Sequence, residues 1–307
     1  MSGAPISPAQ WRRAGLMTAA AAALMLALRL LPKGPQLTHM DFISGGPGAL
    51  EFCDLQNPKF LPVRTRSSPV TMSLDSAMPL TAGGTEEVTL ALGTVTGKPI
   101  GPGDLVPTGA ERINLLAVDP DLEDFQVFPP VPGDRPGRWR FAFTPRRTGV
   151  YRIFADFTPA ATGREMYASA DLEVGPGVGA FGNAPTGREP SWTADREGYR
   201  FSLTPAAIPI RAREPAELKF NVESPDGGPA LLQPIDGGLA SLVAFDRDRT
   251  GFVNLRARAA GGAASAPGRP PLVFSVAIPD PGRYVVWSRV SLGGREIDAP
   301  FRFEVVP

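Results

Sequence analysis

The chain contains an internal repeat, and this repeat limits the possible folds more than any other feature. Residues 115–119 (LLAVD) return as residues 242–246 (LVAFD), and residues 149–154 (GVYRIF) return as residues 282–287 (GRYVVW). Three shorter matches follow the same order: residues 87–90 with 217–220, 163–165 with 294–296, and 172–174 with 303–305. Matches in constant order at a nearly constant spacing indicate that one structural unit has been duplicated.

Within each copy, apolar residues alternate with polar ones. Trp139, Phe141 and Phe143 follow this pattern in the first copy, as Phe301 and Phe303 do in the second. A period of two indicates strands with one buried face. Turn residues recur about every 8–12 positions, which is typical of sandwiches. The sequence therefore predicts an all-β fold: two tandem immunoglobulin-like antiparallel β-sandwiches after a single N-terminal hydrophobic helix.

The same patterns give the expected domain boundaries. The sandwiches are predicted at residues 66–175 and 191–307, and the Gly/Pro-rich residues 176–190 are predicted to link them. Residues 35–65 contain Pro47, Pro58 and Pro62 and are expected to form an irregular membrane-proximal segment. Two domains plus these extra segments fit a length of 307 residues.

The first 34 residues have the pattern of a targeting segment. Arg12 and Arg13 precede an apolar run from Ala14 to Leu28, and Arg29 interrupts the run. This pattern is shared by cleaved signal peptides and uncleaved signal anchors. Because no small-x-small cleavage site follows, an uncleaved transmembrane anchor is the favoured interpretation. It predicts a single-pass protein of the cytoplasmic membrane with its C-terminal domains on the periplasmic, extracytoplasmic side.

Composition narrows the functional classes. Lys+Arg and Asp+Glu both number 31, and this balance gives no basic face for nucleic acid. The chain has one histidine, His39, and one cysteine, Cys53. A lone cysteine cannot form an intramolecular disulfide, and histidine is the commonest general base and a frequent metal ligand. Most hydrolytic mechanisms and most zinc or copper sites are therefore not expected.

The repeated segments resemble a family of exported bacterial proteins. Residues 114–120 (NLLAVDP), 124–130 (DFQVFPP) and 149–157 (GVYRIFADF) are similar to the YtkA-like and related uncharacterised immunoglobulin-like β-sandwich proteins. The resemblance implies the same sandwich fold in both copies. It also implies a metal site, because members of the family often carry histidines in these motifs.

The positions that would carry those histidines hold other residues in this chain. They are Asn114, Val127 and Pro129 in the first copy, and Ser241, Asn254 and Arg256 in the second. Valine and proline side chains offer no lone pair, and arginine is a fixed cation. A transition-metal site is therefore not expected in either sandwich.

Two further patterns have both a chemical and a structural interpretation. Residues 177–182 match GxGxxG, but residues 183–187 (NAPTG) cannot readily start a helix, so a linker is favoured over a dinucleotide site.

An acidic cluster is formed by Asp119, Asp121, Glu123 and Asp124, and the second copy has a smaller counterpart in Asp246 and Asp248. Calcium binding is conceivable. Turn formation is favoured, because the glycine and distal glutamate of an EF-hand are absent.

Isolated reactive and aromatic residues are expected to be structural. A Cys53–His39 nucleophile pair is conceivable, but both residues lie outside the repeats and have no evident third partner. Residues 50–52 (LEF) do not form a lipidation motif, and Cys53 could instead mark contact with a partner protein. Trp139, Trp192 and Trp287 are expected to pack in cores rather than to stack on a ligand.

No residue is therefore predicted to be catalytic, to bind a cofactor or to ligate a metal, and the chain is not expected to be an enzyme. The favoured prediction is a membrane-tethered extracytoplasmic interaction or structural protein with a protein partner in or at the membrane, such as an accessory subunit of a membrane complex. One alternative is a periplasmic copper-handling protein. Another is a hydrolase that uses carboxylates such as Asp156 and Glu165.

Overall fold

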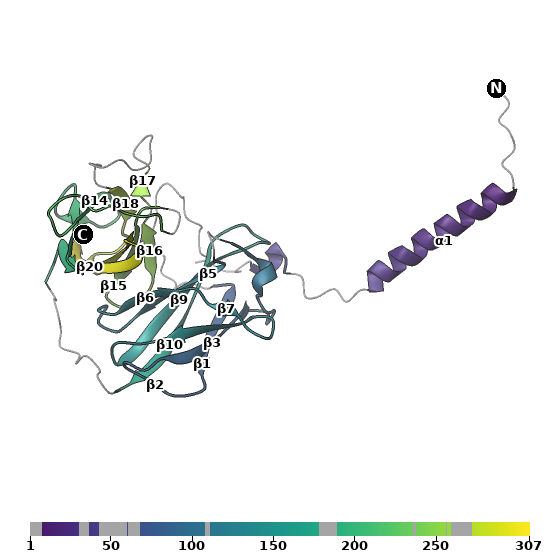
Figure 1. The fold of residues 1–307 in the computed structure, drawn as a ribbon, viewed down its shortest axis with the longest axis horizontal. Coiled ribbons are helices and arrows are strands. Elements are labelled where there is room, and N and C mark those ends of the chain that lie inside the picture. The colour runs from purple at the N-terminus through teal and green to yellow at the C-terminus, as the bar shows by residue number, and fades with distance from the viewer. Residues whose placement is uncertain are drawn as a thin grey trace, which may run out of the picture. The chain divides into compact units, whose positions relative to one another are not determined.

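The computed structural model describes residues 8–30, 37–42, 60, 68–107, 111–177, 189–235, 238–255, 257–258 and 272–307. They fall into two compact units, within residues 1–36 and within residues 37–307 (Figure 1). The first unit holds helix α1, and the second holds every described strand. The prediction of an all-β fold after one N-terminal helix is confirmed.

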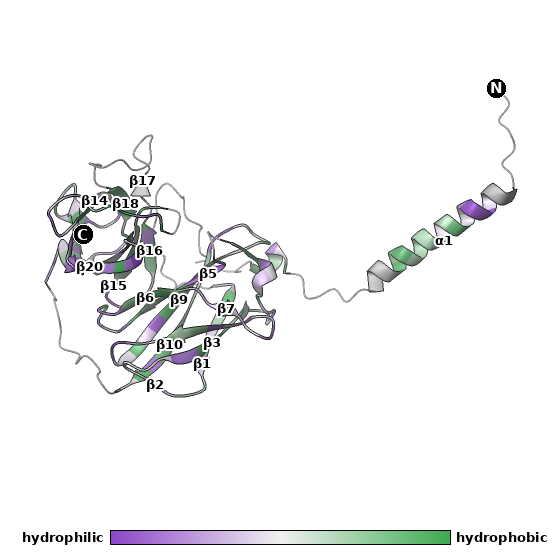
Figure 2. Cartoon of the chain, in the orientation of Figure 1, coloured by the Kyte–Doolittle hydropathy of each residue, from purple (hydrophilic) through white to green (hydrophobic). Residues whose placement is uncertain are grey.

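Helix α1 (Pro8–Leu30) has 23 residues, and Arg12 and Arg13 make a hydrophilic turn near its start (Figure 2). The described side chains from Trp11 to Leu26 are all exposed. Among the described residues, no helix combines the length and the apolarity that crossing a bilayer requires. The transmembrane anchor expected at residues 1–34 therefore has no support from the described helix and stays a prediction. Arg13 and Arg29 bracket an uncharged run that is shorter than the ~20 residues of a spanning helix.

The first sandwich consists of strands β1 to β10, arranged in two sheets. One sheet has the order β1 (Val70–Ser76), β3 (Glu86–Thr94), β8 (Arg138–Phe143) and β7 (Val131–Pro132). The other has the order β2 (Leu80–Thr81), β10 (Met166–Gly175), β9 (Gly149–Pro159), β5 (Ile113–Val118) and β6 (Phe125–Phe128), and β4 (Leu105–Val106) pairs with β9. All pairs are antiparallel except the short β2–β10 pair.

The second sandwich repeats this arrangement with strands β11 to β20. One sheet has the order β11 (Thr193–Arg196), β12 (Tyr199–Pro205), β14 (Pro215–Glu223), β18 (Leu272–Ala277) and β17 (Ala257–Arg258). The other has the order β13 (Ile210–Arg211), β20 (Arg295–Val306), β19 (Gly282–Leu292), β15 (Ser241–Asp246) and β16 (Phe252–Leu255). The short β13–β20 pair is again parallel. Both sheet orders are those of immunoglobulin-like sandwiches.

Strand register supports the duplication. Leu115 on β5 faces Ala155 on β9, and Leu242 on β15 faces Ser288 on β19. These are corresponding residues of the two copies in the sequence matches. Duplicated sequence is therefore paired in a duplicated register. The predicted linker boundaries stay a prediction, because residues 178–188 lie outside the described residues.

Each sandwich has a core of its own. Alternation on β8 directs Trp139 into the first core, where it is 1% exposed. Trp192 packs against the second core and stacks on Phe303, with ring centroids 5.3 Å apart. Each large apolar side chain contributes roughly 1.5–3 kcal/mol on burial, so the cores can be stable without a disulfide. The predicted packing roles of Trp139 and Trp192 are confirmed.

The described part of residues 35–65 packs against both sandwiches. Short helix η1 (His39–Phe42) places Phe42 in the first core. Phe60 lies in the second core, edge-on to Tyr284 at 5.8 Å between ring centroids. The sequence did not suggest these contacts, and the membrane-proximal position of the segment stays a prediction. His39 is exposed, and Cys53 lies outside the described residues.

The docking of η1 is expected to depend on pH through Asp41. Lys98 Nζ lies 2.6 Å from Asp41 Oδ1, and the Thr38 N–H donates to Asp41 Oδ2 at 2.8 Å. Chiefly the Lys98 contact, and then the Thr38 N–H, lowers the Asp41 pKa from 3.8 to about 2. A depressed folded-state pKa stabilises the fold above the unfolded-state value, and this stabilisation is lost as pH falls from 3.8 towards 2.

We expect denaturant unfolding to show a larger acid-induced loss of stability in the native chain than in Asp41→Asn. The comparison between about pH 5 and pH 2 covers the range in which the carboxyl group titrates. Asp41→Asn keeps the size of the side chain and removes the ionisable group. Parallel pH profiles for the two proteins would show that Asp41 does not stabilise this contact.

Candidate functional site: the junction between the sandwiches

The sandwiches meet through a third cluster of buried side chains, which we call the junction. It consists of Leu116, Val118, Leu122, Phe125, Phe154 and Tyr167 from the first sandwich, and Val243, Phe245, Phe252, Val285 and Trp287 from the second. Leu122 lies in the turn between β5 and β6, and the other residues lie on strands, on the sheet faces opposite the two sandwich cores. Their burial removes apolar area from water and therefore stabilises the paired arrangement.

Aromatic rings from both sandwiches interdigitate in the junction. Phe125 stacks on Trp287 with ring centroids 5.5 Å apart, and it lies tilted against Phe245 at 5.8 Å. Phe154 lies 5.3 Å from Phe252. Such pairs contribute ~0.5–1.5 kcal/mol beyond area burial and have specific geometries. The junction therefore restricts the relative orientation of the two sandwiches.

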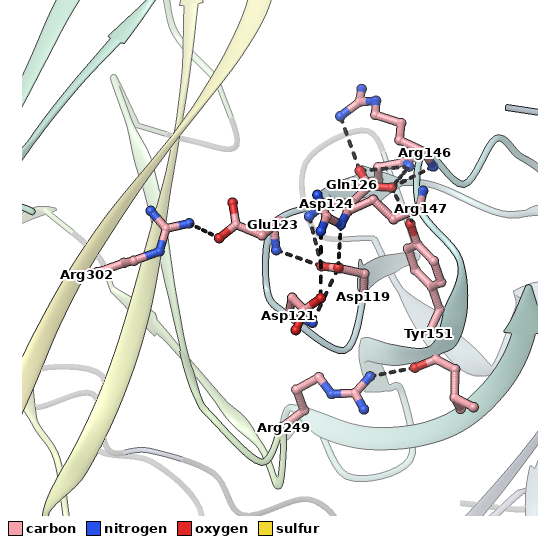
Figure 3. A network of polar contacts seen from close by, with 11 residues as sticks. Asp119, Asp121, Glu123, Asp124, Gln126, Arg146, Arg147, Tyr151, Arg249 and Arg302 are labelled. Carbon is pink, nitrogen blue, oxygen red and sulfur yellow. Dashed lines mark hydrogen bonds and ion pairs between the residues drawn. The ribbon is translucent and has the colours of Figure 1, made fainter. Parts of the chain in front are cut away.

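Buried Asp119 directly follows β5 and organises the loop that leads to Phe125. Figure 3 shows Asp119 bonded to several groups of this loop. Its Oδ1 accepts the N–H groups of Glu123 and Asp124 at 2.6 and 2.9 Å, and its Oδ2 accepts the Asp121 N–H at 3.3 Å. Arg147 Nε lies 3.2 Å from Asp119 Oδ2. Burial raises the pKa of Asp119, while the N–H groups and Arg147 oppose this effect. The predicted turn interpretation of the acidic cluster is thus confirmed for Asp119.

Asp124 ties the same loop to strand β9 and to the loop before it. Its Oδ2 accepts the Tyr151 hydroxyl at 2.6 Å and the Arg146 N–H at 2.9 Å. Gln126 Nε2 donates to the same oxygen at 3.0 Å (Figure 3). Burial raises the pKa of Tyr151 above its ordinary value, and the Asp124 charge adds to this effect. Tyr151 is therefore a neutral hydrogen-bond donor at physiological pH.

Both sandwiches carry a tyrosine that bonds back to the chain just before its strand. The Tyr151 hydroxyl accepts the Arg147 N–H at 3.1 Å, and the Tyr284 hydroxyl donates to the Asp280 carbonyl at 2.9 Å. Immunoglobulin-like sandwiches use a tyrosine in this way to fix the corner before a central strand. These tyrosines are therefore structural features of the fold.

Polar contacts cross between the sandwiches beside the aromatic rings. Arg302 Nη2 on β20 donates to Glu123 Oε1 at 2.7 Å (Figure 3). Arg152 on β9 is 4% exposed and donates through Nη1 to the carbonyls of Asp248 and Arg249, at 3.2 and 2.7 Å. Arg249 in turn donates to the Val150 carbonyl at 2.6 Å. These directional contacts fix the register of the two faces.

The charged residues of this network serve to hold loops and to pair the two sandwiches. Asp119 and Asp124 are occupied by N–H, hydroxyl and guanidinium donors, and Tyr151 is held protonated. Among the described residues, no group of three or more His, Cys, Asp or Glu side chains could hold a metal ion. The geometry is suited to rigid docking of two protein surfaces.

Two positions that would carry the family histidines are linked to the junction. Val127 on β6 is partly buried against it, and Asn254 on β16 pairs with the junction residue Val243. Asn114 and Ser241 lie on β5 and β15, and Arg256 is outside the described residues. In the first copy, Val127 thus makes an apolar contact at a position where the resemblance implies a metal-ligating histidine.

Sequence reasoning missed the junction itself. Trp287 was expected in a core, but it is buried between the sandwiches. A signal was present in residues 115–118 (LLAV) and 242–245 (LVAF), where apolar residues occupy both faces of the strand. Such continuous apolar runs are typical of strands that are buried on both faces.

A family model described as "Domain of unknown function (DUF8832)" matches residues 193–306, which cover nearly all of the second sandwich. No curated protein matches the chain. The matched region begins with strand β11 and ends with strand β20. The family model and the observed strands therefore define the same structural unit.

Solved structures with some likeness to the chain include the Escherichia coli adhesin FdeC and the bacterial integrin-binding protein invasin. FdeC is 17% identical with a TM-score of 0.23, and the match covers 77% of this chain and 64% of that one. Invasin is 12% identical with a TM-score of 0.21, and the match covers 76% and 39%. This chain thus spans less than two thirds of either. Scores this low carry no argument, and the fold rests on the strand order described above.

Proposed function

We propose that the chain is a non-catalytic, extracytoplasmic interaction or structural protein that presents two sandwiches as one rigid body to a protein partner at the membrane. The junction is the observation that carries this proposal. Interdigitated rings and crossing arginine contacts fix the relative orientation of the sandwiches, and a fixed orientation allows loops of both to contact one partner together. Export would depend on the basic and then apolar residues of α1.

The loops are the best candidates for the contact with the partner. The outward face of β8 carries Arg138 and Arg140, so this sheet face is polar. The opposite sheet of each sandwich is occupied by the junction. Exposed apolar side chains occur in turns, at Met78, Val95 and Ile208. Loops held on a rigid scaffold commonly carry binding functions.

Native co-purification tests this proposal. A chain tagged after Pro307, in membranes and in the soluble extracytoplasmic fraction of its own cells, is expected to bring down a protein partner in constant ratio. Recovery of the chain alone from both fractions would contradict the proposal. Copper titration tests the alternative, because stoichiometric micromolar binding would favour metal handling instead.

A further inference from the structure

The junction is built from the same surface of both copies. In the sequence matches, Leu116 corresponds to Val243 and Phe154 to Trp287. Strand register makes Phe125 the counterpart of Phe252, because they pair with the matched residues Val118 and Phe245. All six side chains are in the junction. A contact in which one patch meets its own counterpart is the arrangement of a two-fold symmetric dimer. The two sandwiches thus contact each other as the subunits of such a dimer do.

The main ring contacts are reciprocal in position. Phe125 stacks on Trp287 at 5.5 Å, and exchanging the two copies converts this pair into Phe252 and Phe154, which lie 5.3 Å apart. The loops before β6 and β16 also correspond. Their third residues after the capping aspartate, Leu122 and Arg249, both adopt a left-handed backbone, with φ of 59° and 51°. A residue other than glycine rarely adopts this left-handed conformation unless its surroundings stabilise it.

The two faces have diverged so that unlike copies fit best. Phe245 lies between Phe125 and Phe154, at 5.8 Å from each, and its counterpart in the first copy is the smaller Val118. Pairing two copies of the second face would put a phenylalanine at the position of Val118 as well, and excess volume is poorly tolerated in packed interiors. The hydrogen bonds of Arg152 have no equivalent from the second sandwich, because the residue that corresponds to Arg152 there is Val285.

We propose that the first-sandwich face also docks in trans on the second-sandwich face of a second copy of this chain. The inference rests on the proposed role as an interaction module, and it names one partner. The ring contacts and hydrogen bonds that cross the junction join two separate faces, so a second chain can supply either side. In a single chain the tether raises the effective concentration of the two faces, and closure within the chain competes with docking in trans.

Complementation between two disabled full-length chains tests the inference. Phe154→Glu disables only the first face, and Trp287→Glu disables only the second. When the two variants are mixed, the intact second face of one can bind the intact first face of the other. Sedimentation velocity is expected to show a dimer in the mixture, with association at least about tenfold tighter than that of either variant alone. The double variant is expected to stay monomeric.

Matched controls address folding and surface charge. Ala142→Glu and Thr204→Glu place the same charge on exposed strand positions outside the junction, and their mixture is expected to stay monomeric. Far-UV circular dichroism should show retained strand content in all variants, because Phe154 and Trp287 lie outside the two sandwich cores. Phe125→Glu with Phe252→Glu gives a second complementary pair if one of the first variants does not fold.

Three results would overturn the inference: a mixture that stays monomeric, a mixture that forms only polydisperse aggregates, or single variants that dimerise as tightly as the mixture. The outcome is independent of the co-purification experiment. A different protein partner recovered from cells, together with failed complementation, would remove docking in trans and leave the proposed function in place.

Discussion

Replacing Asp119 with alanine is expected to lower the free energy of unfolding by about 3–5 kcal/mol, the range for removing one partner from a buried ion pair. The change leaves three backbone N–H groups without their acceptor and removes the closest carboxylate from Arg147, which is 8% exposed. Denaturant unfolding at neutral pH measures the loss. Because the same loop presents Glu123 and Phe125, the first sandwich of the variant should also pack less tightly against the second sandwich.

Asp246 provides the matched control, since it is the counterpart of Asp119 in the second copy. It accepts the Thr250 N–H at 2.8 Å, the Thr250 hydroxyl at 3.1 Å and the Gly251 N–H at 3.3 Å, and it forms no ion pair with the described residues. Asp246→Ala should therefore cost less, about 1–3 kcal/mol, as expected when buried donors lose an acceptor. Equal losses in the two variants would show that the buried pair with Arg147 adds nothing.

Replacing Phe125 with alanine is expected to uncouple the two sandwiches. The side chain is 1% exposed and contacts both Trp287 and Phe245 across the junction. Truncating a buried phenylalanine typically costs about 3–5 kcal/mol, through lost burial and the cavity that remains. Because the lost contacts join two bodies with separate cores, calorimetry should show one unfolding transition in the native chain and two in the variant.

A core substitution separates uncoupling from general loss of stability. Phe201→Ala creates a cavity of the same kind inside the second sandwich, where Phe201 is fully buried, and leaves the junction intact. It should lower the stability by a similar amount while the unfolding of the two sandwiches remains coupled. A single transition in Phe125→Ala, or a split transition in Phe201→Ala, would contradict the assigned role of the junction.

These two experiments distinguish a rigid pair from two independent domains on a linker. Contacts between domains of one chain commonly allow relative motion unless the interface is large and hydrophobic. Here, stacked rings lie beside Arg152 and Arg302, whose hydrogen bonds cross between the sandwiches. Coupled unfolding would therefore support the proposal that both sandwiches are presented as one body.

Apolar residues on both faces of β5 and β15 indicate double burial, but no sequence pattern names the surface that covers the second face. Asp119 was recognisable as a turn-forming carboxylate because its hydrogen bonds are local, to the N–H groups of residues 121, 123 and 124. Asp124 bonds mainly to Arg146 and Tyr151, which are distant in the sequence, so its role could not be read from spacing. The partners of Arg152 and Arg302 are far away in the chain, so no spacing rule connects them. Phe60 is a similar case, since an isolated phenylalanine in an irregular segment carries no sign of the core that it enters.

By itself, the sequence determined the strands, their inward faces and their duplication, because alternation along a strand is a local property and a repeated pattern folds in the same way twice. Only the tertiary structure decided that the two outward faces of β5 and β15 meet each other. That contact depends on how two separately folded bodies are oriented. The sequence periodicity of each strand would be the same if its second apolar face met water, a partner protein or the other copy.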